Sequence, residues 1–281
     1  MISLNQSKIF LDSSNPRETK EAKILLGGLK LDGQTTNPSL VAKMIGNKKL
    51  SEKELLAYYK KHVQEISSLV PKGSVSIEVY ADERTKSAEM IEQARVMYKW
   101  ISNAHIKLPI IKEGLRAAEM AIKDGMRVNM TLCFSQEQAA AVYAATLGAP
   151  RGSVFVSPFV GRLDDRGENG MDLIKNIIEM YRSGDNHVEV LTASVRSIDH
   201  IAQAMRLGSD IITCPMKLIG EIKNIKISKH VNDKKHIPYR KINLNQPWNK
   251  FNIKHELTDV GLARFVNDWK FVGMSCDFST T

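Results

Sequence analysis

The apolar run His105-Ile106-Lys107-Leu108-Pro109-Ile110-Ile111 contains one lysine. The run is short and rich in branched aliphatic residues, and a helical pattern begins near Lys112 or Glu113, so we expect a buried strand. Parallel strands are normally covered on both faces, which would hold Lys107 away from water. An unpaired buried ammonium is costly and usually loses its proton, and a neutral amine is the form that attacks a ketone to give a Schiff base. The alternative is a lysine at a strand end whose ammonium reaches solvent.

Strand-like and helical patterns alternate on both sides of this run. Eight short apolar segments lie at 8–12, 31–37, 74–81, 105–111, 127–134, 153–160, 187–193 and 210–213. A segment with helical periodicity follows each of them. These helical segments lie at 16–26, 39–44 together with 51–69, 84–101, 112–122, a stretch that begins at 136, 170–181, 198–207, and a last stretch that ends near 222. The pattern predicts a single-domain (β/α)8 TIM barrel over 1–281. An open doubly wound sheet is the alternative, but the Gly-rich phosphate turn that it usually carries after its first strand is missing from the sequence.

A basic stretch interrupts the pattern after the eighth repeat. Residues 223–254 are rich in lysine and asparagine, and a helix at 259–269 and a loose tail at 273–281 follow. We therefore expect a basic insertion at 223–256 and a C-terminal helix with its tail at 257–281. Because Tyr239 and Trp248 beside these lysines could stack on bases, a non-catalytic nucleic-acid-binding barrel is an alternative function. Lysine-rich loops are usually just solvated, and we expect no nucleic-acid partner.

The composition is typical of a globular protein, with 43% hydrophobic and 25% charged residues and a net charge of +9. No apolar run reaches membrane-spanning length, and the first residues lack a signal-peptide pattern. We expect a cytoplasmic protein without a membrane partner. Cys133, Cys214 and Cys276 are odd in number and far apart, which argues against a disulfide framework or a zinc knuckle. Cys133 and Cys214 are expected to be small buried hydrophobic residues.

Polar residues occur near the carboxyl ends of the first seven expected strands, and these ends meet at one mouth of a barrel, where active sites of this fold lie. They are Asp12, Asn37, Glu78, Lys107, Asn129 with Thr131, Ser157 with Arg162, and Ser194 with Arg196. The carboxylates of Asp12 and Glu78 could move protons. The neutral side chains of Asn37, Asn129 and Thr131 could orient a polyol through hydrogen bonds. Arginine side chains beside a serine could clamp a phosphate. Together with the lysine, these groups indicate Schiff-base chemistry on a sugar phosphate.

Several motifs resemble those of the transaldolase family. The segment 32–40, Asp-Gly-Gln-Thr-Thr-Asn-Pro-Ser-Leu, is similar to the long signature of that family, although Gln34 replaces the usual aliphatic residue. The other matching segments are 105–109 with 113–115, 129–135, 157–162 and 193–196. They cover most of residues 8–222, and they follow the family's order along the chain.

The resemblance implies a role for each matching residue. Lys107 would form an imine with C2 of a ketose phosphate, and Asp12 would take the C4 hydroxyl proton. Glu78 and Thr131 would hold a water that relays protons. The substrate-binding residues would be Thr35, Asn37, Asn129, Ser157, Phe159, Arg162, Ser194 and Arg196. The implied partners are sugar phosphates, with no cofactor and no metal.

The related fructose-6-phosphate aldolases differ at two of these positions, and they are the alternative function. They tend to carry Gln at the third-strand carboxylate and Tyr at the sixth-strand aromatic, whereas this chain has Glu78 and Phe159. Both residues favour transaldolase. A homo-oligomer is left open, because the C-terminal helix often takes part in subunit contacts in this family.

Overall fold

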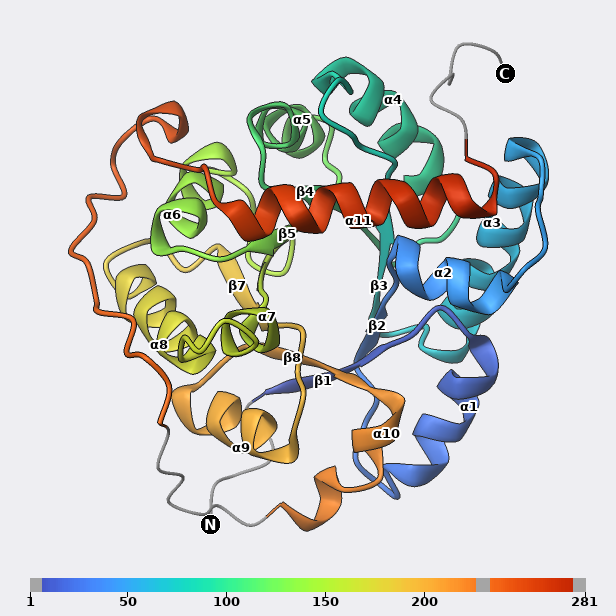
Figure 1. Ribbon diagram of the computed structural model, residues 1–281, viewed down its shortest axis with the longest axis horizontal. Coiled ribbons are helices and arrows are strands. Elements are labelled where there is room, and N and C mark those ends of the chain that lie inside the picture. Colours follow the sequence, from blue (N-terminus) through green and yellow to red (C-terminus); the bar gives the residue numbers. More distant parts are fainter. Residues whose placement is uncertain (1–6, 226–232, 275–281) are drawn as a thin grey trace.

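The computed structural model describes residues 7–225 and 233–274. Eight parallel strands form a closed barrel in which each strand pairs with the next in sequence and the eighth pairs with the first (Figure 1). The strands are β1 (Lys8–Asp12), β2 (Gly33–Thr35), β3 (Ser74–Glu78), β4 (Ala104–Pro109), β5 (Val128–Cys133), β6 (Val154–Pro158), β7 (Val188–Thr192) and β8 (Ile211–Pro215). The expected (β/α)8 barrel is confirmed, and an open doubly wound sheet is excluded.

Helices surround this barrel and follow the strands in order. They are α1 (Pro16–Leu25), α2 (Pro38–Ile45), α3 (Glu52–Leu69), α4 (Ser87–Tyr98), α5 (Lys112–Lys123), α6 (Gln136–Ala145), α7 (Val160–Asp164), α8 (Gly170–Tyr181), α9 (Ile198–Leu207), α10 (Met216–Ile219) and α11 (Glu256–Val272). Two 3₁₀ turns, η1 (Ile222–Asn224) and η2 (Trp248–Lys250), lie before α11. No described helix is long and apolar enough to cross a membrane.

Side-chain caps fix where several helices begin. The side chain of Asn15 accepts a hydrogen bond from the first turn of α1, and Ser135 does the same for α6. Ser51 and Glu54 form a capping box at the start of α3. Each cap satisfies amides that have no partner within the helix and contributes about 1 kcal/mol. The caps at Asn15 and Ser135 place α1 and α6 directly after β1 and β5.

The barrel interior is a packed core. Every residue of β4 is buried, which agrees with a strand that is covered on both faces. Phe10 and Phe155 meet edge to face inside the barrel, with ring centroids 6.0 Å apart. The described cysteines, Cys133 and Cys214, are buried free thiols, as expected, whereas Cys276 lies outside the described residues.

The C-terminal part of the chain returns to the mouth of the barrel. Residues 233–255 run along the outside past α8 and α6, and α11 then crosses the carboxyl ends of the strands (Figure 1). Trp269 of α11 is buried against Tyr59, with ring centroids 5.6 Å apart. This helix extends beyond the expected 259–269 at both ends because His255 caps its start and Gly273 ends it in a left-handed conformation. Residues 226–232 of the basic stretch and 275–281 of the tail lie outside the described residues.

Candidate active site

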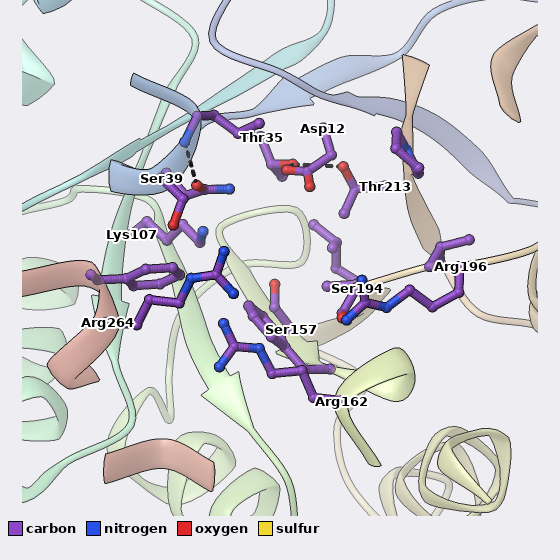
Figure 2. Close-up of a pocket in the computed structure, with 18 of the residues that line it drawn as sticks. Asp12, Thr35, Ser39, Lys107, Ser157, Arg162, Ser194, Arg196, Thr213 and Arg264 are labelled. Carbon is purple, nitrogen blue, oxygen red and sulfur yellow. Dashed lines mark hydrogen bonds between the residues drawn. The ribbon is translucent and has the colours of Figure 1, made fainter. Parts of the chain in front are cut away.

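A cavity of about 310 Å³ opens at the carboxyl ends of the strands, beneath α11 (Figure 2). This volume lies at the small end of the range for ligand pockets. Nine of the twelve predicted site residues line it, namely Asp12, Thr35, Asn37, Lys107, Ser157, Phe159, Arg162, Ser194 and Arg196. Barrel closure therefore brings together residues that are separated by most of the chain.

Lys107 lies at the base of this cavity on β4. Its side chain is only 4% exposed, and Nζ lies 2.8 Å from Oε2 of Glu78, which is also 4% exposed. Strand pairing explains this contact, because Glu78 and Lys107 are register partners on β3 and β4. The Lys107 amine also donates to the carbonyl of Thr36 at 3.3 Å. The alternative of a lysine that reaches solvent is thus excluded, and the buried amine has a carboxylate partner that the sequence analysis did not foresee.

Asp12 provides the second carboxylate at the base of the cavity. Burial raises its pKa, while the charge of Lys107 and a hydrogen bond from Thr35 oppose that rise. The Thr35 hydroxyl donates to Oδ1 of Asp12 at 2.8 Å and contacts the Thr213 hydroxyl at 2.6 Å. Because Thr35 has one hydroxyl proton, Thr213 must be the donor in the second contact.

Glu78 is buried in the same cluster. Burial raises the pKa of Glu78, and the nearby charge of Asp12 adds to the rise, whereas Lys107 opposes it. A raised pKa makes proton transfer from the amine to this carboxylate less costly. The cluster can therefore hold a neutral amine beside a protonated acid as well as an ion pair.

The predicted residues Asn129, Thr131 and Glu78 are buried and do not line the cavity. Glu78 and Asn129 are the register partners of Lys107 on the neighbouring strands. Asn129 accepts a hydrogen bond from Ser157 at 2.6 Å and donates to Ser76 at 3.0 Å, so it holds the cavity residue Ser157 in place. The buried hydroxyl of Thr131 has no hydrogen-bond partner among the described residues. A buried polar atom in this state usually has a water or a ligand as its partner.

Asn37 lines the cavity and also begins a helix. Its side-chain oxygen accepts a hydrogen bond from the Leu40 amide at 3.0 Å and caps α2. The amide NH₂ group of Asn37 can then donate to a substrate. Capping fixes the orientation of this group.

Three arginine side chains point into the cavity from different elements (Figure 2). Arg162 comes from α7, Arg196 from the loop after β7 and Arg264 from α11. Burial lowers the pKa of Arg162, and the positive charges of Arg264 and Arg196 act in the same direction. Crowded cations of this kind are stabilised by an anion, and guanidinium groups suit a phosphate.

The backbone is strained beside these arginines. Ser194 adopts a left-handed conformation with φ of 59°. The amide of Gly161 donates to the Ser194 carbonyl at 3.1 Å, and a Cβ at Gly161 would lie 2.2 Å from that oxygen. Strain of this kind persists where the surroundings hold it, and it clusters at functional sites.

The sequence analysis missed several residues that line the cavity. These are Ser39, Thr213, Lys217, Arg264 and Phe265, with some apolar neighbours. Thr213 could have been found, since it is the last residue of the expected eighth strand. No sequence signal placed Arg264 and Phe265, because helical periodicity does not show which face of the barrel α11 covers. Phe265 lies over the Lys107 amine, with Nζ 5.8 Å from the ring centroid.

A metal site was not expected, and the described residues contain no group of three or more His, Cys, Asp or Glu placed to hold a metal ion. The cavity combines the Lys107 amine, the Asp12 carboxylate and three arginines. Comparison with known proteins identifies the family to which this combination belongs.

A family model described as Transaldolase/Fructose-6-phosphate aldolase matches residues 9–275. The chain belongs to this family. The expected family is thus confirmed, and the protein is a transaldolase-type aldolase enzyme.

Curated relatives match nearly the full length of both chains. A probable transaldolase of Dehalococcoides mccartyi is 39% identical over 268 residues, which cover 94% of this chain and 99% of the relative. A probable transaldolase of Brucella anthropi is 37% identical over 266 residues, which cover 95% and 98%. A probable transaldolase of an Anaeromyxobacter species is 38% identical over 265 residues, which cover 94% and 98%.

Proposed function

We propose that this member of the transaldolase family transfers a dihydroxyacetone unit from a ketose phosphate to an aldose phosphate through a Schiff base on Lys107. The observation that carries the proposal is the buried contact of 2.8 Å between the Lys107 amine and Glu78, in a cavity lined by three arginines. The names of the curated relatives support the same reaction. The donor would be fructose 6-phosphate or sedoheptulose 7-phosphate.

The first half of the reaction forms the imine and breaks a carbon–carbon bond. Glu78 takes a proton from Lys107, the neutral amine attacks C2 of the ketose, and water leaves as the C=N bond forms. Asp12 then takes the C4 hydroxyl proton, the C3–C4 bond breaks, and its electron pair moves into the iminium to give an enamine. The aldose phosphate leaves. A water held by Glu78 and the Thr131 hydroxyl would relay protons in these steps.

The second half reverses these steps with a new partner. C3 of the enamine attacks the aldehyde carbon of an acceptor aldose phosphate, and Asp12 returns a proton to the new hydroxyl group. One water then hydrolyses the iminium and frees Lys107. Phe265 and α11 limit access of water to the intermediate, which favours transfer over simple release.

The remaining residues would hold the substrate. Arg162, Ser194 and Arg196 bind the terminal phosphate, and the cavity position of Arg264 supports a third guanidinium in that group. The neutral residues around the carbon chain would be Thr35, Asn37 and Ser157, with Phe159 packed beside them. Asn129 would act on the substrate through its hydrogen bond with Ser157. A cytoplasmic location and a homo-oligomer remain predictions, as does the division into insertion, C-terminal helix and tail.

Two measurements test the proposal. Borohydride with fructose 6-phosphate should add a covalent mass to the wild type and to Lys112→Ala, whose exposed lysine begins α5, but not to Lys107→Ala. A coupled assay should show turnover of fructose 6-phosphate only when erythrose 4-phosphate is supplied. Turnover without that acceptor would instead identify a fructose-6-phosphate aldolase, and an adduct on Lys107→Ala would exclude the Schiff-base assignment.

A further inference from the structure

The basic insertion contacts the loop between α7 and α8. The Lys235 amide donates to the Gly167 carbonyl at 2.7 Å, and the Asn169 amide donates to the Lys235 carbonyl at 2.9 Å. The Ile237 amide donates to the Asp172 carboxylate at 3.1 Å. This backbone pairing fixes residues 233–237 beside the end of α7, the helix that carries Arg162.

Asp164, the last residue of α7, is where the insertion meets the phosphate residues. Its Oδ2 lies 3.2 Å from Nζ of Lys234 and 2.9 Å from Nε2 of His200, and its Oδ1 accepts from the Gly170 amide at 3.0 Å. Although burial raises the pKa of Asp164, the hydrogen bonds from His200, Gly170 and Lys234 lower it to about 2. The carboxylate is therefore charged and held from three sides.

His200 connects this carboxylate to Arg196. The Arg196 backbone amide donates to Nδ1 of His200 at 3.3 Å, so Nδ1 is an acceptor and the ring proton is on Nε2. Nε2 consequently donates to Asp164, and both side chains are only about a tenth exposed, at 9% and 10%. Lys234, Asp164, His200 and the Arg196 backbone thus form one continuous chain of contacts.

The guanidinium of Arg196 is held by the same end of α7. Its Nη2 donates to Asp165 at 2.9 Å, although the Arg196 side chain is 53% exposed. A second cavity of about 390 Å³, lined by Asp164, Arg196, His200 and Lys234 among others, lies on this side of the arginine. Without the contacts at its backbone and at its tip, Arg196 would have space to turn away from the substrate cavity.

We propose that Lys234, Asp164 and His200 are positioning residues that hold Arg196 for the phosphate group, which makes residues 233–237 of the basic insertion part of the phosphate site. This inference rests on the proposed function only in its use of a phosphorylated substrate. A flexible arginine side chain loses conformational entropy when it binds a phosphate, and this loss is smaller when the side chain is already held in position. Loss of the chain of contacts therefore weakens phosphate binding while it leaves the chemistry at Lys107 intact.

The test compares four variants with the wild type. His200→Phe removes both ring contacts, Lys234→Met removes the amine, and Lys235→Met is the matched control, since Lys235 is exposed and contributes its backbone to the pairing. We expect the first two to raise KM for fructose 6-phosphate about tenfold, equivalent to about 1.4 kcal/mol, with a much smaller change in kcat. KM for unphosphorylated fructose should not change, and Lys235→Met should behave as the wild type. His200→Gln keeps a donor for Asp164 and should recover part of the loss.

Binding of inorganic phosphate, measured by calorimetry, provides a readout that needs no turnover. His200→Phe and Lys234→Met should weaken it about tenfold, even if the protein proves to catalyse a different reaction. Three results would each overturn the proposal. They are an equal increase in KM for fructose and fructose 6-phosphate, a lowered Tm with unchanged KM, and a weakening of phosphate binding in Lys235→Met equal to that in Lys234→Met. If His200→Phe fails to fold, the comparison of Lys234→Met with Lys235→Met still decides it.

Discussion

The uncharged residue Thr35 lowers the pKa of the neighbouring Asp12 carboxylate. Its hydroxyl donates to Asp12 at 2.8 Å, and this hydrogen bond opposes the rise in pKa that burial causes. In the proposed mechanism Asp12 must be deprotonated to accept the C4 hydroxyl proton. We therefore expect the acid limb of the activity profile to report the protonation of this carboxylate.

Thr35→Val should consequently move the acid limb of kcat/KM to higher pH. The substitution removes the hydrogen bond that lowers the pKa of Asp12, so the carboxylate stays protonated over a wider range of acidic pH. At the pH optimum the rate should change much less. Thr213→Val removes only the donor to Thr35 and should move the limb less. A limb that stays in place in Thr35→Val would show that Asp12 is not the base.

Arg264 is expected to contribute to phosphate binding from α11. Its nearest carboxylate, Asp268, is 3.9 Å away, so most of its hydrogen-bonding capacity can be used by a ligand. Arg264→Ala should lower kcat/KM for fructose 6-phosphate roughly ten- to a hundredfold, the range for a charge-assisted hydrogen bond. Lys270→Ala, an exposed cation on the same helix, is the control and should have no effect. Equal kcat/KM values for Arg264→Ala and the wild type would show that Arg264 does not bind the phosphate.

At the scale of elements, the turns after β6 and β7 shape the proposed phosphate site. Gly161 lies in the first turn of α7 in contact with the Ser194 carbonyl, and the neighbouring side chain of Arg196 leaves no space for a methyl group. The two turns therefore support each other.

Gly161→Ala should disturb both turns at once. A Cβ would lie 2.2 Å from the Ser194 oxygen, so the backbone must move, and overpacking of this kind costs about 1–3 kcal/mol. We expect a lower midpoint of urea unfolding and a large increase in KM for phosphorylated donors. Gly167→Ala, in the next loop, has open space around its Cβ but a left-handed φ of 76°, so it should lose stability with a smaller change in KM. A normal KM in Gly161→Ala would contradict the close contact.

The elements differ in how much the sequence says about them. Buried strands such as β4 could be predicted because branched aliphatic runs are local features, and the caps Asn15 and Ser135 could be predicted because they act within one turn. The five residues of α7 were missed because so short a helix has no periodicity. The position of α11 could not be predicted, since it depends on packing between Trp269 and Tyr59, which are distant in sequence.

The same reasoning applies to the site. The strand ends could be predicted to converge because a barrel brings them together, which accounts for most of the residues that line the cavity. The contact between Lys107 and Glu78 depends on the register between two strands. The series of contacts that links Lys234 to Arg196 depends on where the insertion lies. Local patterns carry no information about either.

At the scale of the whole molecule, the net charge of +9 and the arginines of the cavity act on anionic substrates in the same direction. Raising the ionic strength from about 0.01 M to about 1 M shortens the Debye length from ~30 Å to ~3 Å. We therefore expect KM for fructose 6-phosphate to rise steeply with salt, whereas KM for unphosphorylated fructose should stay nearly constant. A parallel change for both substrates would show that salt acts on the fold instead.

α11 supplies Arg264 and Phe265 to the cavity, yet it comes after the whole barrel in the chain. During synthesis all eight strands leave the ribosome before residue 256, so the barrel can close while its mouth is still bare. Until α11 docks, the Lys107 amine lacks the Phe265 ring that lies 5.8 Å from its Nζ in the folded protein. In a chain nicked between 233 and 255, only packing such as that of Trp269 on Tyr59 would keep this cover over the cavity.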